Sequence, residues 1–459
     1  MRLAGIGEQR LHDVVDDLRN SFGSSSVVTD PEIMAGNLTD WTGRFRGEAL
    51  CVVRPVNPWQ VQRVIEIARS SRTAVTSQGG NTSLVGGATP VNGGIILSSQ
   101  LLQGIEIDRH SQIAKVGAGV TLTELNRKAR ESGLRFGVDL AARDSATLGG
   151  MVSTNAGGMH VIRHGGTRQQ LVGIEAILGT GQLVSRLEGL YKDNSGYDWA
   201  SILCGSEGTL GVITKVVVRL VPVPKHRSVA LVSVGSLAAA IRIVSDARRR
   251  FAYLDAAEFM SGTGLEHVER LQDKRWPLGE IPPYALLLET AGEELEVDQL
   301  AEFLDNHEDV DDAALAYDAR AEGLWTWREG QSLAISSQGI PHKLDVTIPI
   351  GEMPAFVAYV SQLIEAEYPA VQAVFFGHLG DGNIHVNLLN VDDADAEIDH
   401  EIFATVASSG GSISAEHGIG RAKVHDLSLT RSPQDISSML SIKKALDPMR
   451  ILNPGILFD

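Results

Sequence analysis

The sequence predicts an α+β protein of two unlike parts, and three observations support that prediction. Long glycine-rich loops interrupt short strands and helices in the first half of the chain. After the proline-rich stretch VPVP, strands and helices alternate in the manner of an antiparallel sheet covered by helices. The chain also has 459 residues, more than one hydrophobic core usually holds, so two or three domains are expected.

Composition and charge narrow the class of protein further. Hydrophobic residues make up 43% and charged residues 21%, which is typical of a soluble globular protein. The net charge of −17 argues against nucleic acid or anionic lipid as the main partner, so an anionic substrate would need a local basic pocket. Two cysteines exclude a disulfide framework, and no apolar run approaches the roughly 20 residues of a membrane span. Because the N-terminus is charged and resembles no signal peptide, we expect a cytoplasmic protein.

Apolar periodicity predicts the elements of the first part, which ends near Pro224. Helices are expected where apolar residues recur at helical spacing and strands where short apolar runs meet turn residues. The predicted helices cover residues 8–22, 58–70 and 122–133, and the predicted strands 52–55, 73–78, 93–99, 105–108, 112–120, two within 171–185, and 211–224.

The second part begins after VPVPKHR and reads as a second alternation. Its predicted strands cover residues 230–234, 284–290, 373–378 and 384–389, and its predicted helices 236–249, 294–307 and 353–368. A helix followed by an extended tail is expected from residue 439 to the end. The predicted domains are therefore 1–224 and 225–412, with residues 413–459 as a C-terminal segment.

Three glycine-rich loops stand out in the first part, namely Gly79–Gly87, Gly149–Gly158 and Gly205–Gly211. Successive backbone N–H groups of such loops can surround a pyrophosphate. The first loop is neither a G-x-G-x-x-G turn that opens a helix nor a Walker loop, so neither of those two nucleotide sites is supported. One loop alone would favour tight turns, whereas three long ones favour a large dinucleotide-like ligand.

The stretch FFGHLGDGNIHVNLL places two histidines on either side of a turn. In a hairpin, His378 and His385 can lie on one face, and Asn387 shares the face of His385 because strand side chains repeat every two residues. Two facing imidazoles form half of a metal site. A pair of hydrogen-bonded polar residues explains the spacing equally well, so the pattern alone leaves both interpretations open.

Two further groups of residues suggest chemistry only in combination with this hairpin. Glu416 could be the carboxylate that completes a set of two histidines and one acid, and His417 beside it could act as a general base. Arg328 and Ser332 share a helical face, and with Lys343 they could bind a carboxylate. Taken alone, both groups fit exposed polar surface better than a site.

Eight motifs together resemble the FAD-linked D-2-hydroxy acid dehydrogenases of the vanillyl-alcohol oxidase / p-cresol methylhydroxylase superfamily, and among them the D-2-hydroxyglutarate type. The resemblance runs from about residue 40 to the end of the chain. It rests on the order and joint presence of RPVNPWQV, QGGNTSLVGG, TLGGMVSTNAGG, KDNSGYD, GSEGTLGVIT, GHLGDGNIH, SAEHGIG and LDPMRILNPG. It implies a two-part FAD-binding domain of the p-cresol methylhydroxylase type, residues 1–224, followed by an α+β substrate domain with an antiparallel sheet, residues 225–412.

The resemblance also implies which residues bind FAD. FAD should be non-covalent, because the first loop lacks the histidine to which some relatives attach it. Residues 413–459 should complete the active site and return to the flavin. The matching positions are Pro55, Gln78, Gly79, Gly80, Asn81, Thr82, Ser83, Gly86, Gly87, Thr147, Gly149, Gly150, Ser153, Asn155, Gly157, Gly158, Glu207, Ile213 and Asn453.

For the D-2-hydroxyglutarate type, the resemblance implies a zinc ion held by His378, His385 and Glu416, with manganese or cobalt as alternatives. His417 matches the catalytic histidine and Asn387 a contact of the substrate carboxylate. Arg328, Ser332 and Lys343 match the pocket for a second carboxylate, although serine replaces the family's threonine there. Lys343 favours a dicarboxylate, because lactate-type relatives generally lack it.

The expected activity is oxidation of a D-2-hydroxy acid, D-2-hydroxyglutarate or D-malate, to the 2-oxo acid, with the hydride passing to flavin N5. The expected partner is an electron acceptor such as an electron-transfer flavoprotein or a quinone, and a homodimer remains an option. The alternatives are a D-lactate or glycolate dehydrogenase, a flavin subunit of a larger electron-transfer complex, and a protein that binds only zinc.

Overall fold

The computed structural model describes residues 13–91, 93–392 and 397–458, and their contacts divide the chain into two compact units. Unit 1 takes the described residues of 1–156, 166–222 and 417–459, and unit 2 those of 157–165 and 223–416. The main change of unit, after Pro222, falls close to the predicted boundary at residue 224. Two features differ from the predicted division, since residues 157–165 join unit 2 and the chain returns to unit 1 at His417 rather than at residue 413.

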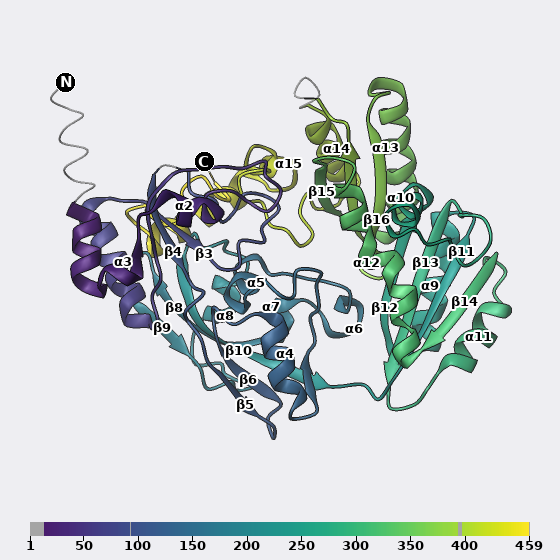
Figure 1. Ribbon diagram of the computed structural model, residues 1–459, viewed down its shortest axis with the longest axis horizontal. Coiled ribbons are helices and arrows are strands. Elements are labelled where there is room, and N and C mark those ends of the chain that lie inside the picture. The colour runs from purple at the N-terminus through teal and green to yellow at the C-terminus, as the bar shows by residue number, and fades with distance from the viewer. Residues whose placement is uncertain (1–12, 92, 393–396, 459) are drawn as a thin grey trace. The chain divides into compact units, whose positions relative to one another are not determined.

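Unit 1 begins with a four-stranded sheet in the order β1-β2-β4-β3 (Figure 1). β2, β4 and β3 are parallel, and helix α3 makes the crossover that a parallel pair requires. Asn57 caps α3 by accepting a hydrogen bond from the backbone N–H of Gln60. The elements are β1 Val27–Val28, α2 Pro31–Met34, β2 Ala49–Val53, α3 Pro58–Ser71, β3 Val75–Gln78 and β4 Gly94–Ser98, with 3₁₀ turns at Ser24–Ser26 and Ala35–Asn37.

A second, antiparallel sheet completes the strands of unit 1 in the order β5-β6-β10-β8-β9, with β7 paired to β10. β10 lies at its centre, and its apolar side chains join a core that also holds the inner faces of α3, α4 and α5. The elements are β5 Ile105–Asp108, β6 Ile113–Gly117, α4 Leu122–Arg130, β7 Leu134–Phe136, α5 Leu148–Thr154, α7 Thr167–Gln170, β8 Leu171–Leu178, β9 Leu183–Arg186, α8 Trp199–Leu203 and β10 Gly211–Pro222.

The C-terminal tail is built into unit 1 by a buried ion pair. Lys443 Nζ lies 2.6 Å from Asp447 Oδ2 and also donates to backbone carbonyls, among them that of Leu452. Asp447 in turn accepts the N–H of Leu452, which forms a parallel bridge with Val75, the first residue of β3. The tail therefore extends the first sheet by one short bridge. Its elements are α15 Leu427–Thr430 and α16 Pro433–Leu446, with a 3₁₀ turn at Val424–Asp426.

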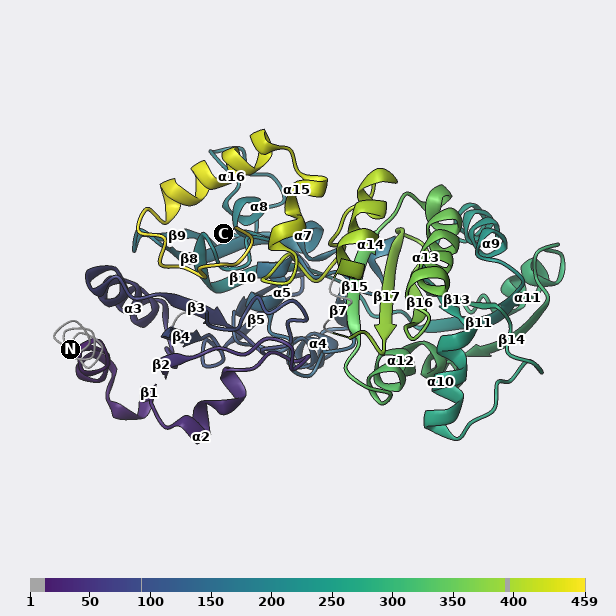
Figure 2. The same cartoon turned by 90° about the horizontal axis from the view of Figure 1, so that it is seen from above.

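Unit 2 is a seven-stranded antiparallel sheet in the order β14-β11-β13-β12-β16-β17-β15, with α10 and α12 on one face and α9 and α13 on the other (Figure 2). Its elements are α6 Val161–His164, β11 His226–Val234, α9 Leu237–Arg250, β12 Leu254–Ser261, α10 Gly262–Gln272, β13 Tyr284–Gly292, α11 Val297–Asp305, β14 Asp312–Tyr317, α12 Glu322–Ser336, β15 His342–Thr347, α13 Met353–Glu367, β16 Gln372–His378, β17 Asn383–Leu389 and α14 Glu397–Ser408, with 3₁₀ turns at Asp318–Arg320 and Ile350–Glu352.

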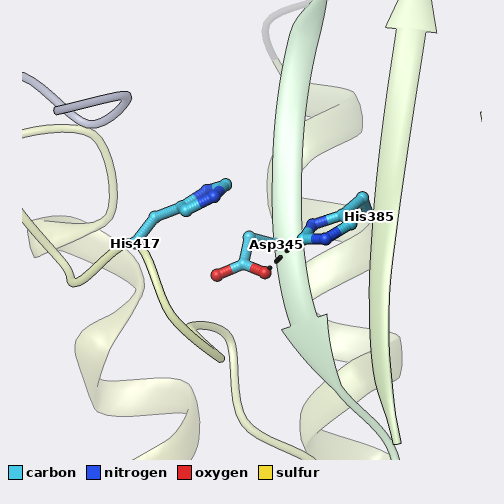
Figure 3. A group of neighbouring side chains, drawn as sticks. All are labelled: Asp345, His385 and His417. Atoms are coloured by element: carbon cyan, nitrogen blue, oxygen red, sulfur yellow. Dashed lines mark ion pairs between the residues drawn. The ribbon is translucent and has the colours of Figure 1, made fainter. Parts of the chain in front are cut away.

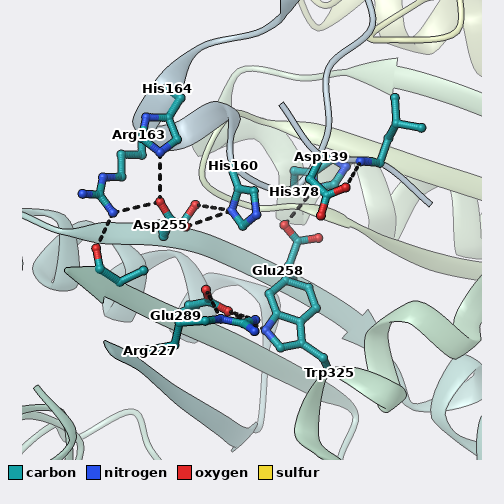
Figure 4. A network of polar contacts seen from close by, with 12 residues as sticks. Asp139, His160, Arg163, His164, Arg227, Asp255, Glu258, Glu289, Trp325 and His378 are labelled. Atoms are coloured by element: carbon teal, nitrogen blue, oxygen red, sulfur yellow. Dashed lines mark hydrogen bonds and ion pairs between the residues drawn. The ribbon is translucent and has the colours of Figure 1, made fainter. Parts of the chain in front are cut away.

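The short segment Gly157–Gly165, which contains α6, is pinned to unit 2 by Asp255 of β12. The Asp255 carboxylate is fully buried and lies 3.0 Å from Arg163, 3.1 Å from His160 and 3.3 Å from His164 (Figure 4). Breaking a buried ion pair such as that of Asp255 with Arg163 costs about 3–5 kcal/mol when one partner is removed. Glycine loop two, predicted as a single flavin-binding segment, is therefore divided between the units.

Several elements were not expected from the sequence. Every residue of β12 is buried, so that its side chains do not alternate between apolar and polar, and α10 follows it directly. The predicted helix over residues 8–22 is described only from residue 13, and residues 13–22 are helical.

Among the described residues no helix is both long and apolar enough to cross a membrane.

Candidate metal centre and cofactor cradle

The first glycine loop of unit 1 packs against the residues that lead into the second, and only glycine fits at these contacts. A Cβ on Gly80 would lie 1.8 Å from the carbonyl oxygen of Ser145, and one on Gly79 would lie 2.4 Å from Thr147 Oγ1. Thr147 also caps α5 by accepting the N–H of Gly150. Such close backbone approach, without side chains in the way, is what a cradle for a pyrophosphate requires.

Gln78 and Asn81 hold the first loop to the chain that precedes β2 and to the residue that follows the loop. Gln78 Nε2 donates to the carbonyls of Asn37 and Ala88, and Asn81 Nδ2 donates to those of Gly36 and Thr39. Asn81 also has a left-handed backbone, with φ of 54°. The NH₂ groups of both amides are used on the protein itself, whereas the buried Asn81 Oδ1 has no hydrogen-bond partner among the described residues. Pro55 is buried directly after β2.

The third loop and the C-terminal tail meet at Asn453. Asn453 Oδ1 accepts the N–H of Ser77, and its Nδ2 donates to the carbonyl oxygen of Glu207. Glu207 itself donates its N–H to Ser153, in the second loop. The predicted cofactor-binding positions of unit 1 thus converge, although they come from four separate parts of the sequence. Ile213 is buried near the start of β10, the strand that follows the third loop.

Glu207 has a second task that the sequence did not indicate. Its carboxylate accepts the backbone N–H groups of Ile419 and Gly420 at 2.8 and 2.7 Å. Burial raises the pKa of Glu207, and these two hydrogen bonds act in the opposite direction. The carboxylate therefore anchors the loop that carries His417, the first residue of unit 1 after the chain leaves unit 2.

Unit 2 brings His378, His385 and Glu416 together. His378 ends β16 and His385 is the third residue of β17, and one ligand atom from each of the three residues lies within 4.8 Å of the others. Register places both imidazoles on one face, because His378 pairs with Asn383, which shares its side of β17 with His385. The predicted hairpin geometry is thus present, and two imidazoles with one carboxylate suit a divalent metal.

Two buried carboxylates stand behind these three residues. Glu258 Oε1 lies 2.8 Å from His378 Nδ1, and Asp345 Oδ1 lies 3.3 Å from His385 Nδ1 (Figures 3 and 4). Asp345 also accepts the backbone N–H of Glu416 at 2.7 Å. Histidine ligands of metals usually donate their second ring nitrogen to a carboxylate in this manner, which leaves Nε2 for the metal.

The pKa values of the three residues differ sharply. Burial lowers the pKa of His378, but the carboxylates of Glu258 and Glu416 outweigh it and raise the value to about 9. Burial lowers the pKa of His385 to about 4 despite Asp345. Burial also raises the pKa of Glu416 to about 7 against the pull of His378. His378 Nε2 lies 3.4 Å from Glu416 Oε1, so the two ligand atoms already lie close enough to share one cation.

The predicted substrate residues of unit 2 lie along the same face. Lys343 of β15 is the direct cross-strand partner of Asn387, which is buried in β17 two residues after His385. Arg328, from α12 above this face, lies with its guanidinium 4.7 Å from the ring of Phe376 and donates from Nε to Glu258. Ser332 follows Arg328 by one helical turn and is partly exposed. Burial lowers the pKa of Lys343 to about 8.

Glu258 and Asp345 were missed at the sequence level, although each left a signal. Glu258 lies in the strand LDAAEFMS, which also holds Asp255, and Asp345 lies between Leu344 and Val346 in HKLDVT. Acidic residues are almost never fully buried unless they are paired. An acid between apolar residues of a strand therefore indicates a buried partner, but the sequence does not say which one.

Comparisons with known proteins now place the chain. Residues 49–186 match the family model "FAD binding domain", and residues 223–457 match "FAD linked oxidases, C-terminal domain". A D-2-hydroxyglutarate dehydrogenase of Xanthomonas citri pv. viticola is 37% identical, with 96% of this chain and 96% of that protein covered. A mitochondrial D-2-hydroxyglutarate dehydrogenase of Arabidopsis thaliana is 33% identical over 96% of this chain and 80% of that protein. A D-2-hydroxyglutarate–pyruvate transhydrogenase of Saccharomyces cerevisiae is 32% identical over 92% and 89%.

Solved structures agree in fold. The 4-ethylphenol oxidase of Gulosibacter chungangensis superposes with a TM-score of 0.75 at 19% identity, covering 97% of each chain. An alkyldihydroxyacetonephosphate synthase superposes with a TM-score of 0.74 at 16% identity, covering 96% of this chain and 84% of that one.

The chain belongs to the FAD-linked oxidases, and it is an oxidoreductase with an FAD-binding domain. The predicted fold class, the predicted family and FAD as cofactor are thereby confirmed. The alternative of a protein that binds only zinc is wrong, since residues 49–186 match an FAD binding domain.

Proposed function

We propose that this protein oxidises D-2-hydroxyglutarate to the 2-oxo acid, with FAD as hydride acceptor and with assistance from a divalent metal. One observation carries the proposal: a metal-type triad, His378, His385 and Glu416, lies at one sheet face of unit 2. Two cations suited to a second carboxylate lie at the same face, Lys343 on β15 and Arg328 on helix α12. The curated relatives named as D-2-hydroxyglutarate dehydrogenases, at 33% and 37% identity over most of both chains, support the choice of substrate.

The residues present fit a bound metal. His378, His385 and Glu416 would hold it, since their ligand atoms already lie close together and carboxylates behind the two histidines favour Nε2 as the metal-binding nitrogen. A bound zinc, manganese or cobalt ion would supply a Lewis acid for the substrate hydroxyl, and bound FAD would accept the hydride. We assign zinc as the first candidate because two imidazoles and one carboxylate are a frequent catalytic zinc set.

The protein residues would then bind, orient and deprotonate the substrate. Arg328, Ser332 and Lys343 hold the far carboxylate and so fix the C2 hydrogen in one orientation. Asn387 contacts the near carboxylate. His417 takes the proton of the C2 hydroxyl as general base while the hydride leaves. A histidine suits this task because its ordinary pKa lies near neutral pH.

Electrostatics at the far carboxylate favour a dicarboxylic substrate over a monocarboxylic one. Arg328 is a buried cation and Lys343 a partly buried one, and a carboxylate beside them would accept charge-assisted hydrogen bonds, which are stronger than neutral ones. The Nε–H of Arg328 donates to Glu258, so a substrate carboxylate would bind the two terminal nitrogens of the Arg328 guanidinium. D-Malate, one carbon shorter than D-2-hydroxyglutarate, is the second candidate substrate.

The remaining assignments extend the sequence-based predictions. FAD is proposed to be non-covalent, because the loop QGGNTSLVGG lacks a histidine. The electron acceptor is proposed to be an electron-transfer flavoprotein or a quinone; pyruvate is a further candidate because one relative is named a transhydrogenase. A cytoplasmic location and a homodimer stay predictions.

A dye-linked assay of the purified chain tests the proposal. Turnover with D-2-hydroxyglutarate, D-malate, D-lactate and glycolate would be compared at equal dye concentration. We expect kcat/KM to be highest for D-2-hydroxyglutarate and at least about tenfold lower for D-lactate, which lacks the far carboxylate; a charged hydrogen bond of about 1.5–3 kcal/mol would account for that ratio. Equal or higher efficiency with D-lactate or glycolate would contradict the proposal and favour a lactate-type or glycolate-type enzyme, with Arg328 and Lys343 merely structural.

A further inference from the structure

Glu258 joins the metal-type triad to the cation that faces the substrate. It lies at the middle of β12 with no exposed surface, opposite His378 in the sheet. Its two carboxylate oxygens have different partners: Oε1 lies 2.8 Å from His378 Nδ1, and Oε2 accepts the Nε–H of Arg328 at 2.7 Å (Figure 4). One side chain thus contacts residues from two different functional groups.

The chemistry of these contacts admits only a carboxylate. Arg328 Nε is a donor that does not lose its proton, so it needs an acceptor. His378 must carry a hydrogen on Nδ1 if its Nε2 is to offer a lone pair to a metal held jointly with Glu416, so Nδ1 needs an acceptor as well. An ionised carboxylate offers two acceptor oxygens and no donor, whereas an amide offers one of each.

We infer that Glu258 is a positioning residue for both groups: it sets the tautomer of His378 for metal binding and the orientation of Arg328 for the far carboxylate of the substrate. The inference rests on the proposed function and assigns a residue that does not itself contact metal or substrate. Loss of Glu258 should therefore weaken two measurable properties together, metal affinity and discrimination in favour of dicarboxylates.

Glu258→Gln is the sharpest variant because it keeps the shape and removes one acceptor. If the amide oxygen faces His378, the amide NH₂ meets the Nε–H of Arg328, and two donors oppose each other. If the amide turns over, it donates to His378 Nδ1 and forces the hydrogen onto Nε2, where it blocks a metal. The site is buried, so water cannot relieve either mismatch.

Glu289→Gln is the matched control. Glu289 lies on the neighbouring strand β13, is also buried, and also holds an arginine, since Oε1 and Oε2 accept from Arg227 while Oε2 accepts from Trp325 Nε1. Its contacts are with neither the metal-type triad nor the predicted substrate residues. A merely structural loss of a buried carboxylate should thus appear in both variants.

The experiment uses full-length protein that contains FAD. Zinc affinity is measured by competition with a chelating indicator, and KM is measured for D-2-hydroxyglutarate and for D-lactate. In Glu258→Gln we expect zinc affinity to fall about 10–100-fold, as for other partners of metal-binding histidines, and the KM for D-2-hydroxyglutarate to rise about tenfold more than that for D-lactate. Glu289→Gln should lower Tm but leave zinc affinity and the KM ratio unchanged.

Contrary results are well defined. Unchanged zinc affinity in Glu258→Gln, a change in only one of the two properties, or equal changes in Glu289→Gln would overturn the inference. If Glu258→Gln does not fold, Glu258→Asp is used instead, because it keeps the charge but is one methylene shorter. Glu258→Asp should lose both zinc affinity and the preference for the dicarboxylate. Wild-type values of both properties in this variant would overturn the inference. A wild-type protein that binds no zinc would instead overturn the metal assignment in the proposed function and this inference with it.

Discussion

His378 and His385 lie on one sheet face with ring centroids 5.3 Å apart, yet their surroundings give them opposite protonation at neutral pH. Glu258 and Glu416 together keep His378 protonated, whereas burial keeps His385 neutral. A cation entering between them would meet one ready ligand and would have to displace one proton. His378 has two carboxylates beside it, whereas His385 has one, and the neighbouring His378 and Arg328 also lower the pKa of His385.

His417 gives the first residue-scale prediction. If it is the general base, His417→Ala should lower kcat for D-2-hydroxyglutarate by roughly 100-fold or more, with zinc and FAD content unchanged. The dye-linked assay at saturating substrate measures this. The neighbouring His425→Ala, in the 3₁₀ turn that follows the loop, is the control and should retain turnover. Near-normal kcat in His417→Ala would show that the base lies elsewhere.

Lys343 gives the second residue-scale prediction, which concerns pH. Burial lowers the pKa of Lys343 to about 8. Below that pH the ammonium group is present and can pair with the far carboxylate; above it the amine is neutral and the pairing is lost. The KM for D-2-hydroxyglutarate should therefore rise as pH passes 8, since only the protonated fraction binds well. The KM for D-lactate should not follow the same curve.

Lys343→Ala provides the matching mutation. It should raise the KM for D-2-hydroxyglutarate about tenfold or more and should abolish the extra pH dependence, while the KM for D-lactate changes little. Comparable changes for both substrates would remove Lys343 from the far-carboxylate pocket. Such a result would leave the metal-type triad and the flavin unaffected, and the substrate panel would then decide the substrate class.

At the scale of elements, the hairpin β16–β17 and the segment Gly157–Gly165 together surround Glu416. A Cβ on Gly157 would lie 2.7 Å from Glu416 Oε1, and one on Gly380, in the hairpin turn, would lie 2.4 Å from the side chain of Ile162. Resemblance assigns Gly157 to the flavin. The structure packs it against the proposed metal ligand, so its lack of a side chain has a use within unit 2.

Gly157→Ala is the corresponding prediction. Because the added methyl group would displace the Glu416 carboxylate, zinc affinity should fall about tenfold or more, while FAD content stays near that of the wild type. The measurement is metal content and affinity of the FAD-containing protein. Gly323→Ala, in α12, is the control, since its Cβ would meet no atom within 4 Å. Loss of FAD with normal zinc affinity in Gly157→Ala would instead support the flavin assignment.

Elements with a marked pattern were predictable and uniformly buried ones were not. α3 and α4 show apolar residues at helical spacing between clear caps, and the hairpin shows two apolar runs around LGDG. β12 is buried throughout, so neither a period of two nor a polar face marked it. Because β12 was not predicted, Glu258 could not be assigned to a strand. Its partner His378 is also 120 residues away in the sequence.

At the scale of the whole molecule, each unit is completed by chain from a distant part of the sequence. Asn453 bonds to Ser77 across 376 residues, and Asp345 holds Glu416 across 71. Spacing alone could suggest that His378, His385 and Glu416 act together, and the family motifs made that suggestion specific. Neither could reveal that Asp255 ties residues 157–165 to unit 2, because such a tie depends on a buried contact between distant segments.

The most direct measurement of the central claim is anaerobic reduction of the bound flavin by D-2-hydroxyglutarate, followed by flavin absorbance in a rapid-mixing instrument. Zinc-loaded protein should be reduced in a single turnover. Chelator-treated protein that retains its FAD should be reduced at least about 100-fold more slowly, as expected if a Lewis acid contributes about 3 kcal/mol, and added zinc should restore the rate. Equal rates with and without metal, or no reduction of the flavin by D-2-hydroxyglutarate at all, would contradict the account.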